Sequence, residues 1–423
     1  MKYFLSIAAA VLTLLPVVRG GEWLQWRGPH SDGVSTATDV PETWSVENNE
    51  NVAWVVKLEG PGSSTPVVTE KFIYLTQSVG SSRALHASCF RREDGKRVWS
   101  VKLATGHSVN RKGNLASPSP ICDGERLYFS FGEGTIAALS FDGDVLWRRN
   151  LEDDHNSFTQ WYGGHSTPLL HDGQLYVPVL RGLRIPKGLP VQKNLSLESL
   201  VLSMDAKTGK TIWSVDRPTD AVHESRDAYT TPVICNDRLV VSGADLITCH
   251  DLKTGKETWR YDYSAERRIK SWRLVPSPVI CGDLILSPYP RGKKMFALSS
   301  KGALEWQYEG SVPDVCTPAL LDGKLFMLDG AKKVLTCLDA EKGRKIWEEN
   351  LEATQTFYAS PTVADGKVYM INLVGEVFVY KASSKPKRLA SFSIGEGGCN
   401  STMVAVDQEL FIRTPTRLIC VKK

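Results

Sequence analysis

Histidine, tryptophan and charged side chains gather in four segments that have no strand-like apolar pattern: Leu103–Ala116, Leu151–Gly164, Val215–Tyr229 and Tyr261–Val275. Carboxylates beside histidines are the groups from which metal centres and acid–base sites are built. Arginines beside tryptophans instead suit the recognition of anions and of protein partners. The side chains concerned, in or at the edge of these segments, are His107, Arg111, Lys112, Asp153, Asp154, His155, Trp161, His165, His223, Glu224, Arg226, Asp227, Arg267, Arg268, Lys270, Trp272 and Arg273.

Three interpretations of this set remain open from the sequence. The first is ordinary loop polarity, because loops are polar and histidine is common in them. The second is a metal or catalytic centre drawn from Asp153, Asp154, His155, His223 or Asp227, although no tight ligand spacing joins them. The third is a binding surface with Trp161 and Trp272 as anchors. Its candidate rim residues are His107, Arg111, His155, Trp161, His165, His223, Arg226, Asp227, Arg268, Trp272 and Arg273.

The elements that must position these loops form a repeat. Val315–Trp347 contains four short apolar runs separated by turn signals such as Asp322–Gly323 and Lys342–Gly343, which predicts a four-stranded antiparallel meander. So small a meander cannot bury both of its faces alone, so it should recur. The residue that opens each first strand recurs every 40 to 64 positions, at Pro66, Pro120, Pro168, Pro232, Pro278, Pro318, Pro361 and, in the eighth unit, Met403. This period is typical of propeller blades.

A tryptophan follows the last turn of most units. Counting back nine or ten residues from it reaches a small residue, such as Cys249 for Trp259 or Ala297 for Trp306. A buried indole needs a small neighbour, so we expect these tryptophans to pack between blades as structural docking residues. The docking set is Trp54, Trp99, Trp147, Trp213, Trp259, Trp306 and Trp347.

Trp54 lies in a strand, Asn51–Leu58, that has no first three strands before it, whereas the eighth unit ends after three strands. We therefore predict that this N-terminal strand completes the C-terminal blade and closes the ring. The nine cysteines form no CxxC motif, and those at equivalent positions of different blades are too far apart to bridge. We expect free, buried thiols with at most one disulfide, and no metal site.

Strand parity predicts which face carries the long loops. In an up-and-down blade the tight turns share one face, while the second-to-third and the blade-to-blade connections share the other. All four extended segments are blade-to-blade connections, and the insertion Arg181–Ser199 lies on the same face. We call this the extended-loop face and expect the site there.

The unit small-x-D-x-x-T-G-K-x-x-W, seen at Ser203–Trp213 and Cys249–Trp259, resembles the docking motif of the pyrroloquinoline-quinone (PQQ) repeat family. That family includes eight-bladed quinoprotein alcohol dehydrogenases and non-enzymatic BamB-type proteins of outer-membrane barrel assembly. The opening Trp23–Gly33, with Pro41–Trp44, is similar to exported PQQ-like propeller proteins of planctomycete-type bacteria. The resemblance covers almost the whole chain from Trp23 and implies the fold more strongly than any chemistry.

Membership of the dehydrogenase branch implies PQQ in a central funnel, a calcium ion, an aspartate base and often a disulfide between adjacent cysteines. This chain has no adjacent cysteine pair, and no loop motif assigns calcium ligands or a base. PQQ and calcium therefore enter only under the alternative function, a quinoprotein-type oxidoreductase with a diverged site.

Residues 1–20 have a lysine, an apolar run and small residues before Gly21, which predicts a signal peptide and export to the periplasm or beyond. No later segment is apolar enough to span a membrane. The 51 basic and 47 acidic residues are dispersed, so nucleic-acid binding is not indicated.

The sequence thus predicts a signal peptide (1–20), an N-terminal extension (21–50) and an all-β, eight-bladed propeller of four-stranded antiparallel blades (51–423). We expect a monomer that serves as a binding or assembly scaffold. Its partner would be a protein, a small ligand or a glycan on the extended-loop face.

Overall fold

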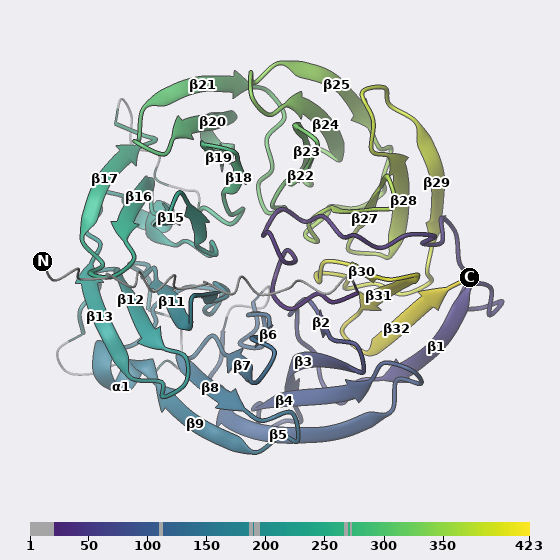
Figure 1. Ribbon diagram of the computed structural model, residues 1–423, viewed down its shortest axis with the longest axis horizontal. Coiled ribbons are helices and arrows are strands. Elements are labelled where there is room, and N and C mark those ends of the chain that lie inside the picture. Colours follow the sequence, from purple (N-terminus) through teal and green to yellow (C-terminus); the bar gives the residue numbers. More distant parts are fainter. Residues whose placement is uncertain (1–20, 110–112, 186–188, 190–194, 266–269, 271–272) are drawn as a thin grey trace, which may run out of the picture.

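The computed structural model describes residues 21–109, 113–185, 189, 195–265, 270 and 273–423. They form eight four-stranded antiparallel sheets arranged around a central axis, and this confirms the predicted eight-bladed propeller (Figure 1). Second strands such as β23 are buried over almost their whole length, because neighbouring blades cover both of their faces. Fourth strands such as β25 alternate between buried and exposed residues, as expected at the rim.

The strands are grouped by blade in chain order. Blade 1 comprises β2 (Val67–Val68), β3 (Phe72–Val79), β4 (Ala84–Arg91) and β5 (Arg97–Thr105), and blade 2 comprises β6 (Ile121–Cys122), β7 (Leu127–Ser130), β8 (Thr135–Leu139) and β9 (Val145–Asn150). Blade 3 comprises β10 (Leu169–His171), β11 (Gln174–Val179), β12 (Leu200–Asp205) and β13 (Thr211–Asp216), and blade 4 comprises β14 (Val233–Cys235), β15 (Arg238–Gly243), β16 (Leu246–Asp251) and β17 (Glu257–Asp262). Blade 5 comprises β18 (Val279–Cys281), β19 (Leu284–Tyr289), β20 (Lys294–Ser299) and β21 (Leu304–Glu309), and blade 6 comprises β22 (Ala319–Leu321), β23 (Lys324–Asp329), β24 (Val334–Asp339) and β25 (Lys345–Asn350). Blade 7 comprises β26 (Thr362–Ala364), β27 (Lys367–Ile371), β28 (Glu376–Lys381) and β29 (Arg388–Ser393), and blade 8 comprises β30 (Val404–Val406), β31 (Glu409–Arg413), β32 (Arg417–Lys422) and β1 (Val52–Lys57).

Three short helices lie in the connections. They are α1 (Leu151–His155), the 3₁₀ helix η1 (His223–Arg226) and the 3₁₀ helix η2 (Pro290–Gly292). No helix among the described residues is both long and apolar enough to cross a membrane.

Ring closure occurs in blade 8, as predicted. Strand β1 pairs antiparallel with β32, with Val55 opposite Ile419 and Val56 opposite Leu418. The first and last strands of the propeller therefore share one sheet, and no blade presents the open edge that a three-stranded blade 8 would leave.

The tryptophans of the fourth strands sit at the contacts between consecutive blades. Within a blade, each faces a small residue across the strand pair, as Trp259 faces Cys249 and Trp306 faces Ala297. Most of their indole N–H groups donate to a carbonyl in the last turn of the next blade. Trp54, for example, donates to the carbonyl of Arg92 at 2.9 Å. The equivalent donors are Trp99, Trp147, Trp213, Trp259 and Trp347.

The glycine of the following turn completes this contact, because its backbone packs directly on the indole ring. At Gly255 the φ angle is +72°, and an added Cβ would overlap the ring of Trp213. The Thr-Gly-Lys turn of one blade and the tryptophan of the blade before it are thus parts of a single joint.

The segment from residue 23 to residue 38 crosses the face of the ring that carries the tight turns, opposite the extended-loop face (Figure 1). Its backbone bonds successively to the inner strands of blades 1, 2, 6 and 7 and to the first turn of blade 8. We call it the axial strap. The partners are Trp23 with Val68, Leu24 with Cys122, Asp32 with Leu320, Gly33 and Ser35 with Val363, and Thr38 with Asp407.

All nine cysteines are free thiols; eight are buried and Cys281 is half-buried. Burial raises the pKa of the Cys89 and Cys337 thiols to about 12, so both stay protonated at neutral pH. These cysteines act as small core residues beside the tryptophans.

Candidate functional site

A circle of hydroxyl groups surrounds the axis where each inner strand begins. Each blade contributes the serine or threonine that stands just before the strand-opening residue. We call this circle the hydroxyl belt: Thr65, Ser119, Thr167, Thr231, Ser277, Thr317, Ser360 and Thr402. All eight residues are at least nine-tenths buried.

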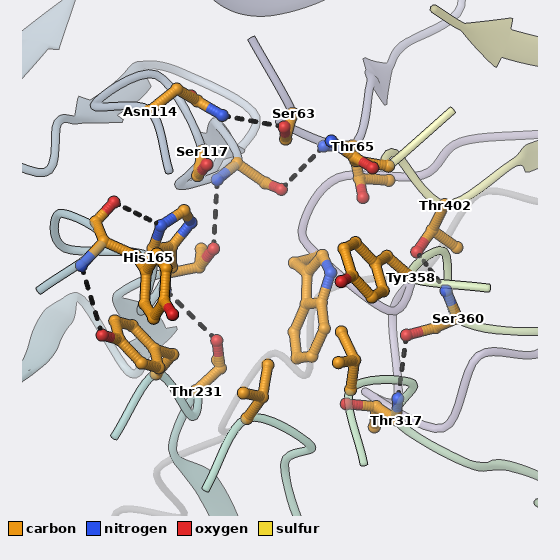
Figure 2. Close-up of a pocket in the computed structure, with 18 of the residues that line it drawn as sticks. Ser63, Thr65, Asn114, Ser117, His165, Thr231, Thr317, Tyr358, Ser360 and Thr402 are labelled. Atoms are coloured by element: carbon orange, nitrogen blue, oxygen red, sulfur yellow. Dashed lines mark hydrogen bonds between the residues drawn. The ribbon is translucent and has the colours of Figure 1, made fainter. Parts of the chain in front are cut away.

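Hydrogen bonds join the belt from blade to blade. The backbone N–H of Thr317 donates to Ser360 Oγ of the next blade at 2.9 Å, and Thr65 N–H donates likewise to Ser119 Oγ at 3.0 Å. Seven such links run from blade 1 to blade 8, all between 2.9 and 3.3 Å. Figure 2 shows, for example, those from Thr317 to Ser360 and from Ser360 to Thr402. Between blades 8 and 1, Ser401 Oγ and the guanidinium of Arg413 donate instead to the carbonyl of Ser64.

The Ser/Thr-Pro sequence explains this arrangement. Proline has no N–H and keeps the preceding residue extended, so the belt residue carries the last backbone donor before the strand. A buried backbone donor needs an acceptor, and the hydroxyl of the next blade supplies one. The belt therefore satisfies the innermost backbone groups of the ring.

A funnel stands on the axis and includes the belt in its wall. Its cavity volume is about 190 Å³, and seven of the eight belt residues line it. Trp26 of the axial strap also lines it, as do residues of the blade-to-blade connections, including Asn114, Tyr162 and Tyr358. The funnel therefore has the strap on its tight-turn side and opens among the blade-to-blade connections of the extended-loop face.

One side of the funnel wall joins aromatic rings to a histidine and an arginine. His165 packs edge-on against Tyr229, with their ring centroids 5.3 Å apart. The guanidinium of Arg273 lies 4.9 Å above the ring of Tyr162 and 3.1 Å from a carboxylate oxygen of Glu224. Among the described residues that line the funnel, Arg273 is the one permanent charge and none is an aspartate or glutamate.

His165 is neutral at physiological pH. Burial lowers the pKa of its imidazole to about 4, and the nearby Arg273 acts in the same direction against the hydrogen bond to Tyr162. The carbonyl of Tyr162, 2.9 Å from His165 Nε2, can only accept, so Nε2 carries the proton. His165 Nδ1 is then an acceptor in a funnel wall that is otherwise rich in donors.

Asp227 is a buried carboxylate beside this wall. It is 1% exposed, and neither of its carboxylate oxygens has a hydrogen-bond partner among the described residues. Burial, reinforced by repulsion from Glu224, raises the pKa of Asp227 to about 7, although Arg184 and Arg273 partly oppose the rise.

We expect Asp227→Asn to stabilise the protein at pH 8 more than at pH 5. The folded carboxyl stays protonated up to about pH 7 whereas the unfolded one ionises near pH 4, so the contribution of Asp227 to stability falls as the pH rises through this window. Between pH 5 and pH 8 the folded protein loses stability over about two pH units, which corresponds to about 2–3 kcal/mol. Asparagine does not ionise, so the variant avoids this loss. Melting curves of both proteins at the two pH values measure the difference. The same substitution at the exposed Asp142 should shift the melting temperature equally at the two pH values, and equal shifts for Asp227→Asn would contradict the assignment.

The other predicted rim residues lie at different places. His107 lines a separate groove between blades 1 and 2, together with Glu133 and Glu152. Trp161 stacks with Arg184 at 5.5 Å, and Arg226 bonds to the carbonyl of Leu197. His155 ends α1, and His223 begins η1. Arg111, Arg268 and Trp272 lie outside the described residues.

Of the predicted rim, His165 and Arg273 line the funnel and Asp227 lies beside it. Sequence reasoning missed the belt, Trp26, and the tyrosines at 162, 229 and 358. A signal for the belt was present, since a serine or threonine precedes each strand-opening residue in all eight units.

The calcium-bound cofactor of the quinoprotein resemblance does not fit these residues. Calcium takes six to eight oxygen ligands, usually including carboxylates. The described part of the funnel wall has no carboxylate, and Asp227 and Glu224 lie beside Arg273 outside the residues that line it. Across the described ranges, no three histidine, cysteine or acidic side chains are grouped so as to hold a metal ion.

The family model described as outer membrane protein assembly factor BamB matches residues 26–179 and 197–423. Among solved structures, a quinohemoprotein alcohol dehydrogenase from Comamonas testosteroni has a TM-score of 0.70 at 12% identity, covering 95% of this chain and 80% of its own. The quinohemoprotein alcohol dehydrogenase ADHIIG from Pseudomonas putida HK5 has a TM-score of 0.69, with the same identity and coverage. BamB from Moraxella catarrhalis has a TM-score of 0.61 at 12% identity, covering 87% of this chain and 96% of its own. No curated protein matches in sequence. At these identities the structural likeness concerns the fold.

Proposed function

This chain belongs to the PQQ-like β-propeller family whose model is described as outer membrane protein assembly factor BamB, and from that premise we propose that it is an exported binding scaffold. Its ligand, either a small molecule or one end of a larger partner, enters the axial funnel from the extended-loop face. The signal-peptide pattern of residues 1–20 supports export to the periplasm or beyond.

The observation that carries this proposal is the funnel wall. It combines aromatic rings with many convergent polar groups, which is typical of a site that recognises a ligand by shape and hydrogen bonding. Acid–base catalysis would need a titratable group within reach of the ligand. His165 is the imidazole among the described lining residues, but with a pKa of about 4 it is a weak base, and its one proton is bonded to a carbonyl. Binding is therefore the function that the described geometry supports best.

Filling the funnel tests this proposal without knowledge of the natural ligand. Val275 is half-buried in the funnel wall, so Val275→Trp should occupy the mouth. Fluorinated fragments that bind the wild-type protein, detected by ¹⁹F NMR, are expected to bind the variant at least about tenfold more weakly. The indole would take up the space that a fragment fills, and forcing both into it costs ~1–3 kcal/mol.

The matched control is Val98→Trp, on the outer strand β5, where the valine is 50% exposed and lies away from the funnel. Fragment binding should be unchanged in this variant. Fragments that bind equally well to all three proteins would show that the funnel is not the site.

A further inference from the structure

The O–H groups of the hydroxyl belt are available as hydrogen-bond donors. Seven of its oxygens accept a backbone N–H from the preceding blade, yet none of the eight hydroxyls donates a hydrogen bond to another described residue. A hydroxyl has one donor and two acceptor sites, so accepting an N–H leaves its O–H available. At the belt, the funnel thus presents a circle of O–H donors at side chains that are more than nine-tenths buried.

The rest of the wall favours the same kind of ligand. None of the described residues that line the funnel is a carboxylate, and Arg273 among them carries a positive charge that it shares with Glu224, 3.1 Å away and outside the lining. Hydrogen bonds from several neutral donors, together with one guanidinium, are the usual means of holding a carboxylate. At least one group of the ligand should therefore be an oxyanion.

The ligand must also carry polar groups around its edge. Apart from Val275 and Val315, every described residue of the wall offers a hydrogen-bonding side chain. Flat aromatic faces are available at the same time, from Trp26, Tyr162 and Tyr358. A sugar ring combines hydroxyls around its edge with apolar C–H faces, whereas a bare aromatic acid would leave most of the polar wall unpaired.

We propose that the funnel binds the terminal residue of an acidic glycan, a sugar of the uronic acid class, with its carboxylate held by the hydroxyl belt. This inference rests on the proposed function. The cavity of about 190 Å³ is below the ~300–1,000 Å³ typical of drug-sized ligands, so it suits a single ring. Because the axial strap crosses the tight-turn side, a chain cannot thread through the ring and only its end can enter.

Thr65 provides a clean test of the belt. Its Oγ accepts no backbone N–H among the described residues, so Thr65→Val removes one O–H donor without leaving a buried N–H unpaired. Calorimetric titration of the full mature chain would use D-glucuronate, D-galacturonate and, as the uncharged counterpart, methyl β-D-glucopyranoside. We expect at least one uronate to bind about tenfold or more tightly than the glucoside, and Thr65→Val to weaken that binding by about tenfold. Thr65→Ser keeps the donor and should bind as the wild type does.

The outcomes separate this inference from the proposed function. Equal affinity for uronates and glucoside would overturn the role of the carboxylate, and an unaffected Thr65→Val would overturn the role of the belt. If neither sugar binds while ¹⁹F fragments still bind in a manner sensitive to Val275→Trp, the glycan assignment fails and the binding function stands. Failure of fragments and sugars together would remove both. The last titration uses PQQ, with and without calcium. Stoichiometric binding of PQQ without binding of either uronate would overturn the glycan assignment and identify a quinone carboxylate as the group held in the funnel.

Discussion

Deletion of residues 21–58 is expected to lower the melting temperature by more than about 10 °C, or to abolish the cooperative transition. The deletion removes β1 from blade 8 and the axial strap from the tight-turn face. It also removes Trp23 and Trp44, which are 1% and 3% exposed. Burying an indole removes ~150–250 Å² from water, about 4–6 kcal/mol each as an upper bound. Two such losses are comparable with the entire ~5–15 kcal/mol by which a domain is stable.

A shorter deletion separates ring closure from the strap. Removing residues 21–50 keeps β1 and Trp54, and its effect on the melting curve measures the axial strap together with residues 39–50, which include the buried Trp44. Trp54→Ala in the full chain should cost about 3–5 kcal/mol in denaturant unfolding, through the joint between blades 8 and 1. If the 21–58 deletion melts like the wild type, the N-terminal strand does not close the ring in solution.

The blades could be predicted because the information that specifies them is local. Each tight turn joins strands that are neighbours in sequence, and each docking tryptophan of blades 1 to 6 faces a small residue nine or ten positions earlier, as Trp347 faces Cys337. Periodicity and turn residues report such contacts directly. Closure of the ring followed from counting strands, since a leftover first strand and a three-stranded last blade complete each other.

The candidate site was harder to predict because it depends on which way a side chain points across the axis. The rim candidates were chosen as histidine, tryptophan and charged side chains of the long connections, yet His107 lies in a peripheral groove and Arg226 bonds to a nearby carbonyl. The funnel wall is made mostly of uncharged threonines, serines and tyrosines. Ser/Thr-Pro recurs visibly in the sequence, but only the assembled ring turns eight separate hydroxyls into one belt.

The contacts of the axial strap could not be predicted from local sequence patterns, because they join residues far apart along the chain. Arg27 bonds to carbonyls 291 and 334 positions away along the chain, and no turn or periodic pattern encodes contacts of that range. A buried arginine in an N-terminal extension gives no sign in the sequence of which blades it will reach.

Arg27→Ala is expected to destabilise the protein strongly by releasing the axial strap. The guanidinium is fully buried and donates to the carbonyls of Pro361 and Pro318 at 2.7 and 2.5 Å. It thereby ties the strap to blades 6 and 7. Alanine leaves both carbonyls buried without a donor, at about 1–3 kcal/mol each, so unfolding in denaturant should show a loss of about 2–6 kcal/mol. Arg97→Ala, at a half-exposed ion pair on β5, should change stability by less than about 1 kcal/mol.

Two further variants distinguish the contribution of the Arg27 charge to stability from that of its hydrogen bonds. Burial lowers the pKa of Arg27 to about 10, so the strap retains a charge whose desolvation opposes folding. Arg27→Lys keeps the charge but not the fork of donors, and it should recover only part of the loss. Arg27→Met removes the charge and fills much of the space. If Arg27→Met is as stable as the wild type, the two proline carbonyls find water from the funnel, and the strap is held by Trp23 and its backbone bonds instead. If Arg27→Met loses as much stability as Arg27→Ala, the two hydrogen bonds themselves anchor the strap across the ring.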